Sequence, residues 1–110
     1  MDPELIARCR NRLIEVARQR GTITYGHLAS HLGIANRGSW DMLDEIYNKE
    51  TAAGRPDLTL LVVKAATGYP PYFSRGGPAR SVRFDPTKDL QPWAAELTRV
   101  YQTWAQLLNS

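Results

Sequence analysis

The fold is decided by residues 22–33, Thr-Ile-Thr-Tyr-Gly-His-Leu-Ala-Ser-His-Leu-Gly, in which a β-branched run leads directly into a helical pattern. The β-branched run favours extended backbone, so we expect one short edge strand there. Thr24 is a good N-cap for a helix over residues 25–32, and Gly33 is a good stop. The apolar positions that define this helix are Leu28, Ala29 and Leu32.

The segments on either side predict two more helices. Before the strand, residues 4–20 follow a good N-cap, Asp2, with Pro3 at the first helical position, and Gly21 is a good stop. The apolar stripe of this helix is Leu5, Cys9, Leu13, Val16 and Ala17. After a turn over residues 34–38, Ser39 caps a third helix from residue 40 to about residue 52. Its inward positions are Leu43, Ile46 and Tyr47.

The second half of the chain predicts two strands, a long loop and a closing helix. Residues 58–64 and 81–84 read as strands, and the Gly-, Pro- and aromatic-rich residues 65–80 between them read as a hairpin loop. Residues 92–108 predict a strongly amphipathic helix. One face of this helix carries Trp93, Leu97, Val100, Tyr101, Trp104 and Leu108.

This element order predicts an α+β winged helix-turn-helix, with helices around a small antiparallel sheet and a long wing. One domain over residues 1–110 is expected, since a chain of 12.4 kDa has room for one core. It divides into helix one (1–21), the helix-turn-helix (22–53), the strand-wing-strand segment (54–84) and the closing helix (85–110).

The composition is that of an ordinary globular domain. Apolar residues make up 43% and charged residues 23% of the chain, which excludes a disordered class. No apolar run approaches the roughly 18 residues that span a bilayer, and the first residues have no signal core. We therefore expect a cytoplasmic protein without membrane contact. The one cysteine, Cys9, falls on the apolar stripe of the first helix, which favours a buried hydrophobe over a nucleophile.

The placement of charge is more informative than the net value of +3. Residues 51–84 carry five basic residues against one acid, Asp57, whereas residues 22–50 carry two against four. Eleven of the fourteen basic residues are Arg, the side chain that binds phosphate bidentately. The distribution favours an anionic partner for the second half of the chain.

The loop over residues 68–80, GYPPYFSRGGPAR, joins Arg to aromatic side chains. Guanidinium groups neutralise phosphates while rings stack against bases, so this wing is typical of a nucleic-acid surface. The alternative is a loop folded back on the core with Tyr69 and Phe73 buried, and the two can coexist.

Residues 21–29, GTITYGHLA, followed by Leu32-Gly33, resemble the opening of the DNA-binding part of the O6-alkylguanine DNA alkyltransferases and alkyltransferase-like proteins. The resemblance implies that Tyr25 and Arg37 handle a flipped nucleotide. The Pro-Cys-His-Arg motif of that family is missing. Aligning Val62-Val63 with the family's paired valines places Thr59 at the nucleophilic Cys and Leu60 at the His, so alkyl transfer is excluded on chemistry.

No catalytic or metal-binding constellation is visible elsewhere. His27 and His31 are four residues apart on one helix, but no third ligand follows at a recognisable distance. We expect no enzyme activity, no metal and no cofactor. The third helix carries Asp41, Asp44 and Glu45 on its outward face, which would repel phosphates in a major groove.

The sequence thus predicts a non-catalytic DNA-binding protein that uses its wing and the start of its third helix. The expected DNA contacts are Tyr25, Arg37, Ser39, Arg55, Lys64, Tyr69, Tyr72, Arg75, Arg80 and Arg83. The alternative is a protein-interaction module, a regulator or inhibitor, that uses the acidic third helix and the aromatic wing. Homodimerisation through the closing helix stays open.

Overall fold

The first helix, α1 (Pro3–Arg18), begins as its capping residues predict. A computed structural model describes residues 2–36, 40–73 and 82–108 of the chain. The Asp2 carboxylate accepts a hydrogen bond from the Glu4 N–H, with Pro3 at the first helical position. The stop differs from the prediction: Arg20, not Gly21, takes the left-handed conformation (φ 55°), and Gly21 N–H donates to the Val16 carbonyl.

The deciding stretch folds as predicted. Strand β1 (Ile23–Thr24) leads into α2 (Tyr25–Leu32), and the Thr24 hydroxyl accepts a hydrogen bond from the His27 N–H at 3.1 Å. Gly33 ends α2 in the left-handed conformation, φ 72°. The third helix, α3 (Asp41–Ala52), starts one residue later than predicted, and the predicted cap, Ser39, lies outside the described residues.

The predicted antiparallel sheet is wrong. Strand β2 (Val62–Val63) pairs with β1 in parallel, with Ile23 opposite Val62 and Thr24 opposite Val63. Most of the predicted strand over residues 58–64 is instead a 3-10 helix, η1 (Leu58–Leu61). The Asp57 carboxylate causes this turn, because it accepts hydrogen bonds from both the N–H and the hydroxyl of Thr59. Only the two valines are left extended, and the return through α2 and α3 sets their direction.

Of the second predicted strand, residues 81–84, the structure describes 82–84, which contribute one antiparallel bridge. Arg83 is opposite Tyr72, and not opposite any residue of the predicted strand over 58–64. The stretch from residue 64 to residue 69 is closed by a turn instead: Lys64 N–H donates to the Tyr69 carbonyl, and Gly68 takes φ 75°.

The last helix, α4 (Pro86–Leu108), starts six residues before the predicted position. Asp85 accounts for the early start, since its carboxylate accepts hydrogen bonds from the Thr87 N–H and hydroxyl, and these bonds lower the pKa of Asp85. Pro86 fits the first helical position, whereas Pro92 lies inside the helix. No helix in the described part of the chain is both long and apolar enough to cross a membrane.

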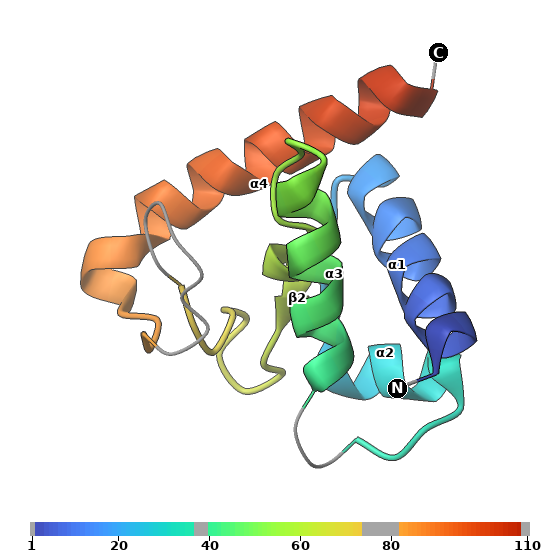
Figure 1. Cartoon of the computed structure of the whole chain (residues 1–110). Coiled ribbons are helices and arrows are strands. Elements are labelled where there is room, and N and C mark those ends of the chain that lie inside the picture. Colours follow the sequence, from blue (N-terminus) through green and yellow to red (C-terminus); the bar gives the residue numbers. More distant parts are fainter. Residues whose placement is uncertain (1, 37–39, 74–81, 109–110) are drawn as a thin grey trace.

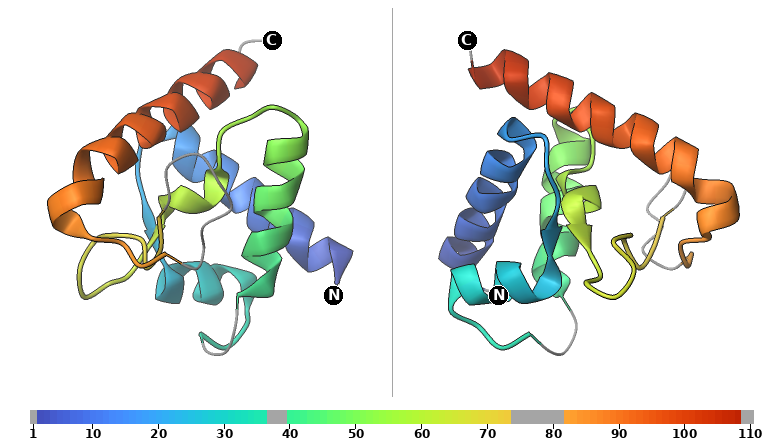
Figure 2. Two further views of the ribbon diagram at one scale, coloured as in Figure 1. Left: turned by 60° about the vertical axis from the view of Figure 1, so that its left-hand side comes forward. Right: turned by 180° about the vertical axis from the view of Figure 1, so that it is seen from behind.

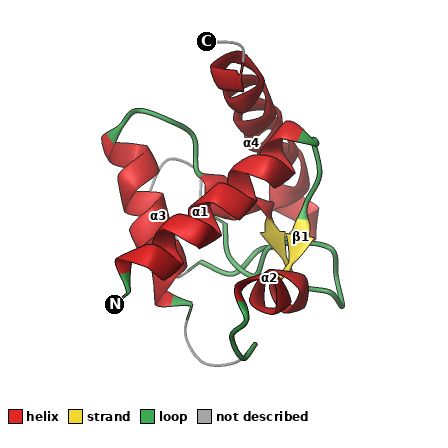
Figure 3. Ribbon diagram, turned by 90° about the vertical axis from the view of Figure 1, so that its right-hand side faces the viewer, coloured by secondary structure: helices red, strands yellow, loops and turns green. Residues whose placement is uncertain are grey.

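In the described part of the chain, four α-helices enclose one core around a two-stranded parallel sheet, an α+β arrangement as predicted. In Figure 1, α4 runs across one end of the molecule, over the ends of α1 and α3, and α2 lies at the opposite end. Both views in Figure 2 keep this order, and Figure 3 shows the strands side by side next to α2. Two side chains of α4 fasten it to distant backbone: Trp93 Nε1 donates to the Leu60 carbonyl and Tyr101 to the Gly21 carbonyl, at 3.1 and 2.8 Å.

Candidate nucleic-acid interface

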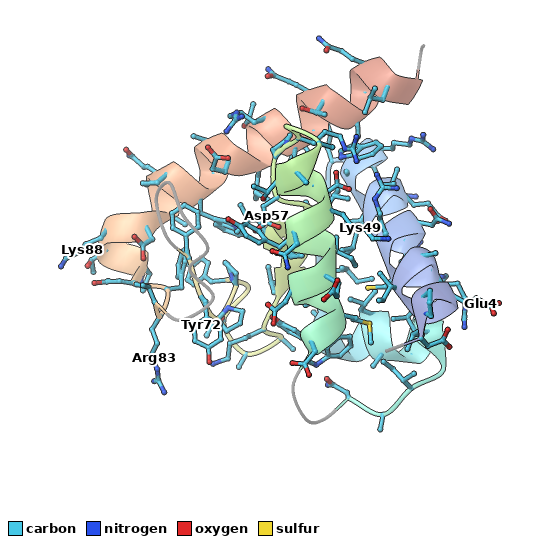
Figure 4. The ribbon with its side chains drawn as sticks, viewed as in Figure 1. Glu4, Lys49, Asp57, Tyr72, Arg83 and Lys88 are labelled. Carbon is cyan, nitrogen blue, oxygen red and sulfur yellow. The ribbon has the colours of Figure 1, made fainter. Side chains whose placement is uncertain are left out.

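The Tyr72–Arg83 bridge presents two of the predicted contacts to solvent. Phe73 N–H donates to the Val82 carbonyl at 2.9 Å, and Phe84 N–H donates to the Pro71 carbonyl at 3.0 Å. These bonds flank the bridge, so Tyr72 and Arg83 form a non-hydrogen-bonded pair whose side chains share one face. Both side chains are exposed, and in Figure 4 the two residues are neighbours, with the Arg83 side chain extending away from the ribbon.

The opposite face of this bridge packs on the core. Phe73 is buried, and Phe84 stacks on Tyr69 with ring centroids 5.1 Å apart. Trp93 meets the rings of Tyr69 and Phe84 edge-on. The two readings of the aromatic loop therefore divide by residue: Tyr69 and Phe73 fold back on the core, and Tyr72 stays outside. Tyr69 is half-buried and holds the bridge in place.

Lys64 and Tyr25 each follow one of the two paired strands, and only Lys64 is exposed. The Lys64 side chain is exposed where β2 ends, and its backbone closes the turn to Tyr69. Tyr25 is half-buried at the start of α2, and its ring meets Trp40 edge-to-face at 5.3 Å. This contact ties the start of α2 to the residue before α3.

Arg55 is half-buried, and its guanidinium group already has an ion-pair partner. Its guanidinium pairs with the carboxylate of Glu50, which is 0% exposed, and Arg10 Nε reaches the other carboxylate oxygen at 2.6 Å. Both guanidinium groups lie over the Trp104 ring, 5.4 and 5.7 Å from its centroid. This buried cluster was missed in the sequence. The signal was present, because Glu50 continues the inward spacing of Leu43 and Ile46.

The remaining predicted contacts are Arg37, Ser39, Arg75 and Arg80, which lie outside the described residues. The described ones do not share one end of the molecule, because Arg55 lies over the Trp104 ring of α4 and Tyr69 packs edge-on against Trp93 of the same helix. In Figure 1, α2, residues 33–36 and the start of α3 lie opposite α4, whereas Figure 4 shows Tyr72 and Arg83 below the start of α4. Asp41, Asp44 and Glu45 are exposed on α3, as the spacing predicts.

The residues that the sequence offered for alkyl transfer or metal binding do not form a reactive site in the described residues. Thr59 is 5% exposed, and its hydroxyl donates to the Asp57 carboxylate at 2.6 Å. His27 and His31 are both exposed on α2. Over residues 2–36, 40–73 and 82–108 no three His, Cys, Asp or Glu side chains gather closely enough to hold a metal ion.

Cys9 should resist thiol reagents in the folded protein. Its side chain is fully buried among apolar residues, and this burial raises the pKa of the thiol to about 11. We expect labelling by a disulfide reagent at neutral pH to be slower by at least about a hundredfold than in denaturant, because modification waits for opening of the core. Equal rates in the two conditions would show that Cys9 is accessible.

Comparison with models of protein families, with curated proteins and with solved structures finds no match for this chain.

Proposed function

We propose that this protein is a non-catalytic DNA-binding domain of winged helix-turn-helix type, with the loop over residues 68–80 as its wing. The observation that carries the proposal is the Tyr72–Arg83 pair, a tyrosine and an arginine opposite each other on one bridge with both side chains exposed. A guanidinium group binds phosphate, and an aromatic ring packs against bases or sugars.

Charge in the same segment supports the proposal. Lys64 and Arg83 are exposed, and the sequence adds Arg75 and Arg80 between them. Arg55 is excluded from the proposed contacts, because its guanidinium already pairs with Glu50. Tyr25 follows Thr24 and Lys64 follows Val63, and these two strand residues are paired, which keeps Tyr25 among the proposed contacts.

The proposed function is non-catalytic because of the position that the family resemblance assigns to the nucleophile. Thr59 stands there in place of a Cys, and its buried hydroxyl donates to Asp57. A threonine without a neighbouring His or thiolate offers no route to alkyl transfer.

Replacing Lys64 or Arg83 by Ala should weaken DNA binding and make it less dependent on salt. Removing one phosphate-binding side chain makes the negative slope of log K against log[salt] shallower by about 1. The measurement is fluorescence anisotropy with labelled DNA at about 50 and about 200 mM salt. Arg99→Ala is the matched control, since Arg99 is an exposed arginine on α4 that pairs with Glu96. Absent or salt-independent binding by the unaltered protein would contradict the proposal.

The exposed acids of α3 favour a second candidate function, a protein-interaction module. Asp41, Asp44 and Glu45 give this helix a negative outward face, which suits a basic partner better than DNA. A stoichiometric partner that survives nuclease treatment and no longer binds after Asp41→Lys or Glu45→Lys would support this function in place of the first.

A further inference from the structure

The aromatic side chains of this protein differ in their exposure to solvent. All ten lie in described residues, and nine of them are buried or half-buried. Tyr72 is the exception, with 39% of its surface exposed. The backbone around it is well anchored, because Phe73 and Phe84 on the other face of the bridge join the core. An aromatic ring held outward on an anchored backbone loses little conformational freedom on binding.

The partner of Tyr72 across the bridge strengthens this feature. Arg83 is exposed on the same face, and among the described residues no carboxylate is in ion-pair contact with it. The Arg10, Arg20 and Arg55 guanidinium groups, in contrast, each lie over an aromatic ring of the core. Arg83 therefore keeps its hydrogen-bond donors for a ligand.

We propose that the Tyr72–Arg83 pair binds single-stranded nucleic acid, with the Tyr72 ring stacked on an unpaired base and the Arg83 guanidinium on a neighbouring phosphate. This inference rests on the proposed function and specifies its substrate. In a duplex the faces of each base are covered by neighbouring bases, so an outward ring has no base to stack on. An unpaired base exposes its face, and stacking on it tolerates any sequence.

The acidic residues of α3 also favour a single strand over a duplex. A stiff duplex that reached the bridge would also extend along the molecule, where Asp41, Asp44 and Glu45 repel phosphates. A single strand is flexible enough to follow the bridge and the Lys64 turn without approaching α3. The stacking ring and the repulsive helix together therefore select against the duplex.

The test compares a labelled oligothymidine of about 16 nucleotides with a duplex of the same length, using the full chain. We expect the single strand to bind more tightly by about tenfold or more. Tyr72→Leu should remove most of this preference, and Tyr72→Phe should keep it, because stacking needs the ring and not the hydroxyl. An oligouridine of equal length shows whether RNA serves as well as DNA.

Val82→Thr is the matched control, since Val82 is exposed next to Arg83 but lies on the other face of the bridge. Circular dichroism of each variant confirms that it is folded. Duplex binding as tight as single-strand binding, with Tyr72→Leu affecting neither, would overturn this inference and leave the DNA-binding function standing. Failure to bind either oligonucleotide would contradict the proposed function itself.

Discussion

Replacing Glu50 by Gln should lower the free energy of unfolding by about 3 kcal/mol. The Glu50 carboxylate is 0% exposed and is the shared partner of Arg10 and Arg55. A neutral amide leaves two positive groups close together without their counter-charge. Those groups are 25% and 31% exposed, so water screens them in part, and the loss should fall at the low end of values for a broken buried pair.

The measurement is urea unfolding at neutral pH, with Glu45→Gln as the control on the same helix. Glu45 is exposed, and its replacement should change stability by no more than about 0.5 kcal/mol. The arginines offer a further check. Removing either one leaves Glu50 a partner, whereas removing both leaves it buried and alone, so the double variant should lose more stability than the sum of the single variants. Equal effects of Glu50→Gln and Glu45→Gln would show that the cluster contributes little.

The parts of the fold that the sequence predicted correctly are encoded by neighbouring residues. Thr24 caps α2 through the N–H of His27, three positions away, and Gly33 ends that helix by its own backbone conformation. The parallel direction of the two strands, in contrast, is not encoded by neighbouring residues. It depends on where α3 returns the chain, and the apolar run over residues 58–63 fits a strand as well as a 3-10 helix.

The candidate site also contains residues that the sequence placed correctly and one that it did not. Lys64, Tyr72 and Arg83 are exposed, as expected for contacts in and beside the predicted wing. The role of Arg55 could not be predicted locally, because its place is fixed by a carboxylate that also binds Arg10, 40 residues away from Glu50. Binary patterning expects a glutamate near a helix end to face solvent, and it makes no allowance for a buried acid with distant partners.

Replacing Trp93 by Ala should cost about 3–5 kcal/mol. The indole is 7% exposed, packs edge-on against Tyr69 and Phe84, and donates its N–H to the Leu60 carbonyl. Truncation leaves a cavity between α4, η1 and the bridge. Trp93→Phe keeps a ring but loses the hydrogen bond, and should cost about 1–3 kcal/mol. Leu90→Ala, at an exposed position of the same helix, should be neutral within about 0.5 kcal/mol.

The same variants test how the candidate interface is held. Trp93 supports Tyr69 and Phe84, and Phe84 lies next to Arg83 in the chain, so the indole fixes the bridge without being part of its exposed face. If the outward pair acts as a preformed site, Trp93→Phe should weaken oligothymidine binding under conditions where circular dichroism shows it folded. Leu90→Ala should bind normally. Unchanged binding by folded Trp93→Phe would show that Tyr72 and Arg83 reach their ligand without support from the core.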